Sequence, residues 1–408
     1  MTIEKKNIVI MWFANFLVAA SATMVLPFLS LYIKTLGDFS DAYVQQWAGY
    51  VFGVTFLVAF LFSPIWGRFG DKYGRKKILV ITSAGIGISV LLMGFVTSVT
   101  ELFILRAFMG VVTGFIPMSA ALISAQCKKE TAGRTLGTLQ TGTVSGGLCG
   151  PLLGGMLADT VGFQYTFTLT GAVIILASLL VLFGINEVVF KEANDEENKV
   201  YTRKEVIMHI FKSPILMSVM LISLVIQAAN FSIQPLLALY VHELTRTENL
   251  AFLAGFAFSV TGLGNLVATR RWGSLGDKIG HGKVLIILLF TSALFFIPQA
   301  LVTELWQLII LRFLFGLQIG GLLPCMTAYI RQLAPLSIQG EVLGYNVSFR
   351  FLGNVIGPVM GGVIAAAFGI GMVFYISGFL LVISAVFLWV SVARESKRIQ
   401  EKKTNMSA

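Results

Sequence analysis

The chain has 408 residues, of which 56% are hydrophobic and only 12% carry a charge, and its mean hydropathy is +0.84. About a quarter of the residues of a soluble globular protein are charged, so this composition excludes a soluble enzyme or binding domain. The net charge of +10 does not indicate a nucleic-acid partner, because the basic residues form short clusters between apolar runs. The composition therefore predicts an all-α protein embedded in a lipid bilayer.

Twelve apolar segments follow one another along the chain, and each is close to the ~20 residues that a helix needs to cross the hydrocarbon core. We expect membrane-spanning helices at residues 8–33, 45–66, 77–97, 102–126, 135–158, 163–186, 214–241, 250–271, 283–301, 305–330, 341–366 and 370–392. The first segment continues past Pro27, which favours an uncleaved span over a secretory signal.

The distribution of basic residues predicts the orientation of these spans. With the N-terminus inside, 25 of the 30 lysines and arginines lie in cytoplasmic segments, and only Lys34 and Arg246 lie in outer loops. The positive-inside rule therefore predicts a multi-pass protein of the cell membrane with both termini in the cytoplasm.

One long polar stretch interrupts the series after the sixth span and carries the acidic run Asp195-Glu196-Glu197. Such a charge run is typical of a solvated linker. We therefore predict an N-terminal six-helix bundle at 1–186, a cytoplasmic linker at 187–213, a C-terminal six-helix bundle at 214–393 and a cytoplasmic tail at 394–408.

The two predicted bundles carry the same motifs at offsets of 206 to 208 residues. The segment GRFGDKYGRKK, which starts at Gly67, returns as GSLGDKIGHGK, which starts at Gly273. The other matched sets are Pro27 with Pro235, then Arg106, Gly110 and Gly114 with Arg312, Gly316 and Gly320, then Gly146, Gly150, Pro151, Gly154 and Gly155 with Gly353, Gly357, Pro358, Gly361 and Gly362. We therefore expect two pseudo-symmetric bundles that share one fold.

This set of motifs resembles the major facilitator superfamily over essentially the whole chain. The Asp71 loop is similar to the signature between its second and third spans, and Gly150-Pro151 resembles a fifth-span motif of its antiporters. The first-span Pro27 and the phrase Phe62-Ser63-Pro64-Ile65-Trp66-Gly67 resemble its twelve-span drug:proton antiporter branch, in particular Gram-positive efflux pumps for fluoroquinolones and dyes. The resemblance implies the major facilitator fold and transport by alternating access.

The loop after the second predicted span has the composition of a conformational latch. A carboxylate at the end of a helix can cap a neighbouring helix N-terminus or pair with an arginine, whereas basic residues alone would only mark the inner face. The predicted latch residues are Gly67, Arg68, Asp71, Gly74 and Arg75, with Asp277 in the second copy, which we expect to be weaker because it lacks the arginines.

Arg106 and Arg312 lie inside predicted spans, where a charge is costly unless it finds a partner or reaches the membrane surface. The resemblance implies a role in proton coupling for Arg106, with Asp71 as a second coupling residue. Because an arginine does not release its proton near neutral pH, its role must be electrostatic. No Asp or Glu lies near the middle of any predicted span, so the sequence leaves the proton carrier open.

Polar side chains also occur on otherwise apolar predicted helices. Gln227, Asn230 and Gln234 share one helical face, and Arg350 lies near the middle of its span with asparagines four residues to either side. Such groups either line a cavity or bond a neighbouring helix. The predicted cavity comprises Asn15, Phe16, Met109, Phe115, Met118, Gln227, Asn230, Phe231, Gln234, Asn346 and Arg350, a set whose methionines and aromatic rings suit varied drugs.

The glycines of the fifth and eleventh predicted spans are expected to bring helices into close contact, and their prolines to add a bend. The residues in question are Gly146, Gly150, Pro151, Gly154, Gly155, Gly357 and Pro358. Packing explains them in part, and control of sealing between two access states is the functional interpretation.

The sequence therefore predicts a monomeric, proton-coupled multidrug efflux pump, with drugs or dyes, protons and the lipid bilayer as its partners. The alternative is a transporter dedicated to one metabolite or organic anion, anchored by Arg350. We expect no cofactor and no metal, and we do not expect an enzyme, because no catalytic constellation or phosphate loop occurs in the sequence.

Overall fold

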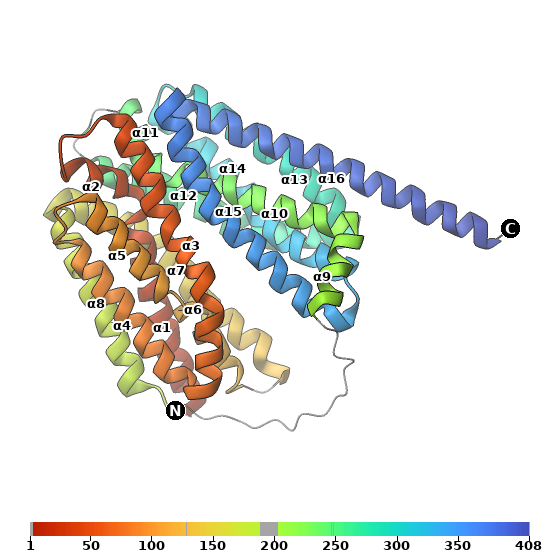
Figure 1. Cartoon of the computed structure of the whole chain (residues 1–408), viewed down its shortest axis with the longest axis horizontal. Helices are drawn as coiled ribbons and strands as arrows, with labels where there is room; N and C mark the ends of the chain where they lie inside the picture. Colours follow the sequence, from red (N-terminus) through yellow and green to blue (C-terminus); the bar gives the residue numbers. More distant parts are fainter. Residues whose placement is uncertain (1–2, 128, 188–202, 246, 248, 408) are drawn as a thin grey trace. The chain divides into compact units, whose positions relative to one another are not determined.

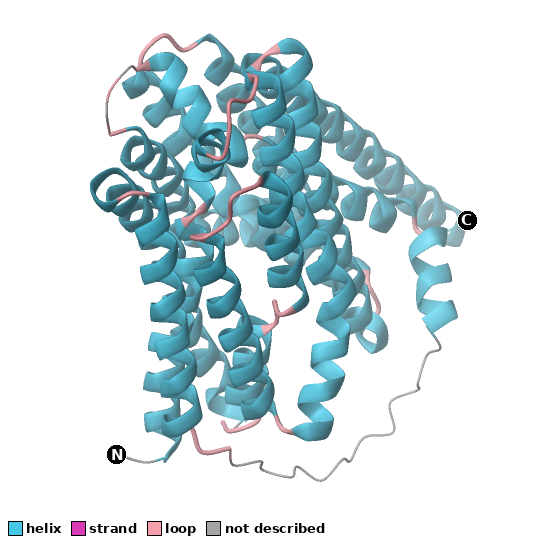
Figure 2. Cartoon of the chain, turned by 60° about the vertical axis from the view of Figure 1, so that its left-hand side comes forward, coloured by secondary structure: helices cyan, strands magenta, loops and turns pink. Residues whose placement is uncertain are grey.

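A computed structural model describes residues 3–127, 129–187, 203–245, 247 and 249–407 (Figure 1). The described residues form α-helices, short 3-10 segments and connecting loops, and no strand occurs among them (Figure 2). The expectation of an all-α protein is confirmed.

The helices before residue 188 are α1 (Ile3–Met24), α2 (Leu29–Thr35), α3 (Asp41–Tyr73), α4 (Arg75–Met93), α5 (Val99–Val111), α6 (Phe115–Ser124), α7 (Lys129–Val161) and α8 (Phe163–Gly184). Those after residue 202 are α9 (Arg203–Lys212), α10 (Pro214–Ser232), α11 (Leu237–Leu244), α12 (Leu250–Ile279), α13 (His281–Phe296), α14 (Leu305–Leu333), α15 (Gln339–Phe368) and α16 (Ile370–Ser407). Four 3-10 segments complete the described elements, namely η1 (Leu26–Phe28), η2 (Gln234–Leu236), η3 (Ile297–Leu301) and η4 (Leu336–Ile338).

Eleven helical segments of the described chain are long and apolar enough to cross a membrane. They correspond to every predicted span except 135–158. This segment is also helical, as part of the 33-residue α7, but its many glycines and its threonines lower its hydropathy. A twelfth span at α7 therefore stays a prediction.

Two sets of residues form compact units. The first unit is Met1–Asn194, Gln234–Ser259 and Pro358–Ala367, and the second is Asp195–Ile233, Val260–Gly357 and Phe368–Ala408. The predicted division of the chain at 187–213 stays a prediction.

Three spans of the described chain are interrupted, and a proline lies at or just after each interruption. Pro27 and Pro235 each occupy the middle of a 3-10 segment, because proline lacks the N–H that an α-helix needs and clashes with the preceding turn. The third interruption lies between α5 and α6, where residues 112–114 are not helical, because Pro117 in the first turn of α6 cannot donate to the Thr113 carbonyl and its ring clashes with it. Transporters use such breaks to place backbone groups inside the membrane.

Glycines let α7 lie directly against α1. An added β-carbon at four glycines spaced by four residues would overlap a backbone carbonyl oxygen of α1; the pairs are Gly142 with Trp12, Gly146 with Phe16, Gly150 with Ala20 and Gly154 with Met24. In the second unit, Gly353 and Gly357 of α15 meet the carbonyl oxygens of Leu224 and Ala228 of α10 in the same way. These contacts favour the packing role of Gly146, Gly150, Gly154 and Gly357, which stays a prediction.

A tryptophan hydrogen bond occurs in both units at equivalent positions. The Trp66 Nε1–H donates to the Val111 carbonyl at 2.5 Å, and the Trp272 Nε1–H donates to the Leu317 carbonyl at 2.9 Å. Both residues of the second pair lie 206 positions after those of the first. Because α5 ends at Val111, Trp66 provides a partner for a carbonyl that the broken helix leaves free.

We expect Trp66→Phe to lower the free energy of unfolding by about 2 kcal/mol, because it leaves the half-buried Val111 carbonyl without a partner. Trp272→Phe should cost less, since Leu317 lies inside the continuous helix α14 and its carbonyl keeps a helical partner. Thermal unfolding in detergent measures both, with Trp306→Phe, a change at a 60% exposed ring, as control. Equal costs for Trp66→Phe and Trp272→Phe would contradict this account of the break.

Candidate functional site

The loop between α3 and α4 turns at a single glycine. Gly74 has φ +99°, a left-handed conformation that glycine adopts without steric cost. Gly280, 206 positions later, has φ +96° at the junction of α12 and α13. The two copies of the predicted latch loop therefore turn in the same way.

Arg75 and the start of α4 are hydrogen-bonded to helix α6 and to the loop that follows α8. The Arg75 Nη1–H donates to the Ala121 carbonyl in α6 at 2.5 Å. The backbone N–H groups of Arg75 and Lys76 donate to the Glu187 carboxylate at 2.7 and 3.2 Å. Glu187 thus caps the N-terminus of α4, where a negative charge is favourable.

Sequence reasoning placed Glu187 in the linker and missed this cap. The only signal was an acid directly after the sixth predicted span.

The latch itself stays a prediction. Asp71 belongs to α3, but its side chain lies outside the described part of the structure. Arg68 is exposed, and an added β-carbon at Gly67 would meet nothing within 4 Å. In the second copy, Asp277 is mostly exposed and lies 3.3 Å from Nε2 of His281, a contact within the same loop.

The two predicted membrane arginines are buried. Arg106 is 3% exposed and Arg312 is 2% exposed. In the described structure, Nε and Nη2 of Arg106 and Nε of Arg312 have no hydrogen-bond partner. Buried guanidinium donors without partners are costly, which favours a functional role for these groups.

The polar residues of α10 and α15 bond one another inside the second unit. The Gln227 Nε2–H donates to Asn354 Oδ1 at 3.0 Å, and the Ser223 hydroxyl donates to Asn346 Oδ1 at 2.5 Å. These two bonds lie one helical turn to either side of Arg350, which is half-buried and whose Nε has no partner in the described structure. These two bonds join α10 to α15, and the Arg350 Nε between them has no partner among the described residues.

Several predicted cavity residues are enclosed in the first unit. Asn15 is 1% exposed and accepts a hydrogen bond from the Ser119 hydroxyl at 2.9 Å, while its Nδ2 has no partner among the described residues. Phe115 is 1% exposed. Met109, Met118 and Gln234 are also buried, whereas Phe16, Asn230 and Phe231 are half-buried. Their common role as a cavity lining stays a prediction.

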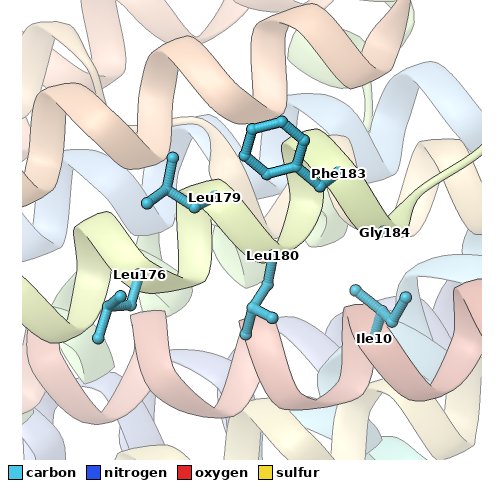
Figure 3. A pocket seen from close by; sticks show the side chains of 6 residues that line it. All are labelled: Ile10, Leu176, Leu179, Leu180, Phe183 and Gly184. Carbon is cyan, nitrogen blue, oxygen red and sulfur yellow. The ribbon is translucent and has the colours of Figure 1, made fainter.

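Two depressions illustrate the chemistry of the surface. One, of about 550 Å³, lies between α1 and α8 and is lined by Ile10, Leu176, Leu179, Leu180, Phe183 and Gly184 (Figure 3). All its side chains are apolar, as expected for a surface in contact with lipid. The other, of about 330 Å³, has both polar and apolar lining and is formed by Glu341, Gly344, Tyr345 and Ser348 of α15. No predicted cavity residue lines either depression.

No group of three or more His, Cys, Asp or Glu side chains in the described chain is placed to hold a metal ion. The chemical features that remain are buried arginines, amide pairs and interrupted helices in apolar surroundings. Together with the eleven apolar helices, they define a polytopic membrane protein of the transporter class. The sequence matches the Major Facilitator Superfamily over residues 11–270 and 220–407, and the chain belongs to this family.

The relatives cover almost the whole chain. It is 60% identical over 380 residues to the "uncharacterized MFS-type transporter YuxJ" of Bacillus subtilis strain 168, across 93% of this chain and 97% of that protein. It is 39% identical over 395 residues to the "multidrug resistance protein MdtG" of Dickeya zeae strain Ech586, across 97% of this chain and 96% of that protein. The MdtG protein of Salmonella typhi is also 39% identical, over 397 residues, 97% of this chain and 98% of that protein.

Solved structures share the fold. A bacterial homologue of the human lysosomal transporter Spinster superposes with a TM-score of 0.78 at 16% sequence identity, over 96% of this chain and 97% of the other. A D-xylose-proton symporter superposes with a TM-score of 0.76 at 15% identity, over 95% of this chain and 98% of the other. At these identities the likeness concerns the fold alone.

Proposed function

We propose that this chain is a proton-coupled efflux pump that exports structurally varied lipophilic drugs and dyes by alternating access between two six-helix bundles. The observation that carries the proposal is the 39% identity to proteins named for multidrug resistance, which extends over the whole chain. In this proposal α7 also crosses the membrane, as the fifth of twelve spans. Both termini are cytoplasmic, and the protein acts as a monomer in the cell membrane. The tryptophan bonds and glycine contacts that recur 206 or 207 positions apart support the two related bundles.

The buried arginines support a coupled transporter. Nε and Nη2 of the buried Arg106 have no partner among the described residues, so an anionic group that moves close to it gains a strong interaction. We assign proton coupling to Arg106 and Asp71, the latch to the Asp71 loop, and sealing to the glycine contacts of α7 and α15.

Proteoliposomes with an imposed proton gradient test the proposal. The purified chain should move several chemically unrelated dyes, such as ethidium and a fluoroquinolone, and an uncoupler should stop the movement. Liposomes without protein and liposomes with Arg106→Ala serve as controls. Movement of a single solute, with all unrelated dyes excluded, would overturn the multidrug assignment.

A transporter dedicated to one metabolite or organic anion is the second candidate. The Nε of Arg350 lies between two hydrogen-bonded pairs of α10 and α15 and has no partner in the described structure. This donor favours the second candidate, because a guanidinium binds a carboxylate or phosphate through two parallel bonds.

We expect Arg350→Ala to reduce the transport of anionic or zwitterionic solutes about tenfold while cationic dyes are little affected, because a charge-assisted bond is worth ~1.5–3 kcal/mol. Uptake of matched anionic and cationic fluorescent solutes measures the difference. Arg331→Ala, which removes an exposed charge at the end of α14, is the control. An equal loss for both solute classes would mean that Arg350 has a structural role.

A further inference from the structure

Asp159 forms an unusual contact at the end of α7. Its Oδ1 accepts a hydrogen bond from the backbone N–H of Ala251 at 3.1 Å, and its Oδ2 accepts one from that of Phe252 at 2.7 Å. Both donors belong to the first turn of α12, which begins at Leu250. The first N–H groups of a helix have no partner within the helix, and a negative charge at that end is favourable. Asp159 therefore caps α12 from a helix more than 90 positions earlier in the chain.

The same two helices are in close contact beyond the cap. The Ser259 hydroxyl of α12 donates to the Leu148 carbonyl of α7 at 2.8 Å. Between this bond and the cap, an added β-carbon at Gly155 would overlap the Ala251 carbonyl, and one at Gly255 would overlap the Pro151 carbonyl. All of these residues belong to the first unit. The cap thus lies at one end of a close interface that runs over about three turns of α7 and about two turns of α12.

An equivalent interface between α3 and α15 lacks the carboxylate. An added β-carbon at Gly49 would overlap the Pro358 carbonyl, and one at Gly362 would lie 2.6 Å from the Gln45 carbonyl oxygen. These pairs match Gly255 with Pro151 and Gly155 with Ala251 at offsets of 206 and 207 positions. The position equivalent to Asp159 is Ala366. Close packing of this kind therefore does not require an acid.

The start of α3 also shows how a helix in this position is capped locally. The Ser40 side chain, in the same segment of chain, accepts from the Tyr43 N–H at 3.3 Å. The cap of α12 instead comes from a separate helix, so it exists only while α7 and α12 are in contact.

We propose that Asp159 is a gating residue of the transport cycle, whose carboxylate holds α7 against the N-terminus of α12 and is released when this end of the protein opens. The inference rests on the proposed alternating access, because α7 and α12 belong to different predicted bundles. Asp159 lies on the predicted outer side, at the opposite end of its bundle from the Asp71 loop. Two carboxylates at helix ends, one for each side of the membrane, give each closed state a latch of its own.

The rate at which a buried cysteine reacts measures the opening directly. Ser259→Cys, at a 5% exposed position inside the interface, is the reporter in a chain with Cys127→Ser, Cys149→Ala and Cys325→Ala. Its labelling by N-ethylmaleimide is followed in proteoliposomes without drug or gradient. Adding Asp159→Ala should raise the labelling rate roughly tenfold, since it removes two charge-assisted bonds from the closed state. Adding the nearly isosteric Asp159→Asn, which keeps one acceptor oxygen, should raise the rate about threefold.

Two matched controls test whether the effect is specific to the Asp159 cap. Ser40→Ala removes the local cap of α3. Thr160→Ala changes the residue next to Asp159; in the described structure the Thr160 hydroxyl donates to two carbonyls of α7 itself. Both should leave the labelling rate within about twofold of the parent, because neither removes a bond between α7 and α12. If the Asp159→Asn protein elutes as folded protein and its labelling rate equals that of the parent, the proposal is overturned and Asp159 is a passive cap.

The gating role of Asp159 and the efflux proposal can fail separately. If dyes are exported but the Asp159 variants are labelled at the parent's rate, only the gating role is wrong. If Ser259→Cys is labelled faster in the Asp159 variants but no drug or dye moves in any assay, the gating role of Asp159 stands and the efflux assignment is wrong.

Discussion

Gly146→Leu is expected to prevent stable assembly of the first unit. A β-carbon at this position would overlap the Phe16 carbonyl and approach the Ala20 backbone, so a leucine can be accommodated only if α7 moves away from α1. Overpacking of a close contact costs about 3 kcal/mol. The contacts of Gly142, Gly150 and Gly154 along the same interface would be lost together with that of Gly146. The yield of monodisperse protein in detergent and its melting temperature measure the effect.

The next residue supplies the control for this substitution. An added β-carbon at Gly147 would meet nothing within 4 Å, so Gly147→Leu places the same side chain on the same helix in open space. We expect this variant to be produced and to melt like the parent protein. If both leucines were tolerated equally, the close contact between α7 and α1 would not be needed for stability.

Local sequence signals predict most of the fold. Apolar runs of sufficient length locate eleven of the spans, and Pro27 and Pro235 locate two of the interruptions, because proline acts on its own helix. The break between α5 and α6 was not predicted, although Pro117 in the first turn of α6 has no N–H for the Thr113 carbonyl and its ring clashes with that group. Trp66, 45 residues before Val111, provides a partner for the freed Val111 carbonyl, and this contact between distant residues has no local sequence signal.

The candidate site is harder to predict, because its contacts join residues far apart in the chain. Glu187 and Asp159 read as acids at the ends of spans, and only the folded chain shows that each caps a distant helix. The even spacing of Asn346, Arg350 and Asn354 indicates a polar face, but spacing does not reveal which members find partners on α10. The asparagines are bonded there, whereas the Arg350 Nε has no partner in the described structure.

Arg106→Ala is expected to abolish proton-coupled export while the protein still folds. The guanidinium is 3% exposed, and Nε and Nη2 have no partner in the described structure, so its removal sacrifices no hydrogen bond of those two nitrogens. What is lost is the only positive charge in α5, which we propose attracts an anionic group during the cycle. The backbone carbonyl of Arg106, which accepts from the Thr55 hydroxyl at 3.1 Å, is retained. Dye-driven proton flux in proteoliposomes measures the coupling, and the melting temperature reports on the fold.

Two further variants test whether coupling needs the guanidinium geometry of Arg106 or only its charge, and whether it needs the equivalent arginine of the second predicted bundle. Arg106→Lys keeps the charge but loses the planar fork of donors, so we expect a reduction of at least tenfold in coupled flux, equivalent to ~1.4 kcal/mol. Arg312→Lys makes the same change 206 positions later, at a side chain that is 2% exposed. If coupling belongs to the first half of the chain, Arg312→Lys keeps most of the flux. Equal losses at both positions would assign the arginines a shared structural role, since the two sites match in burial and in the free Nε donor.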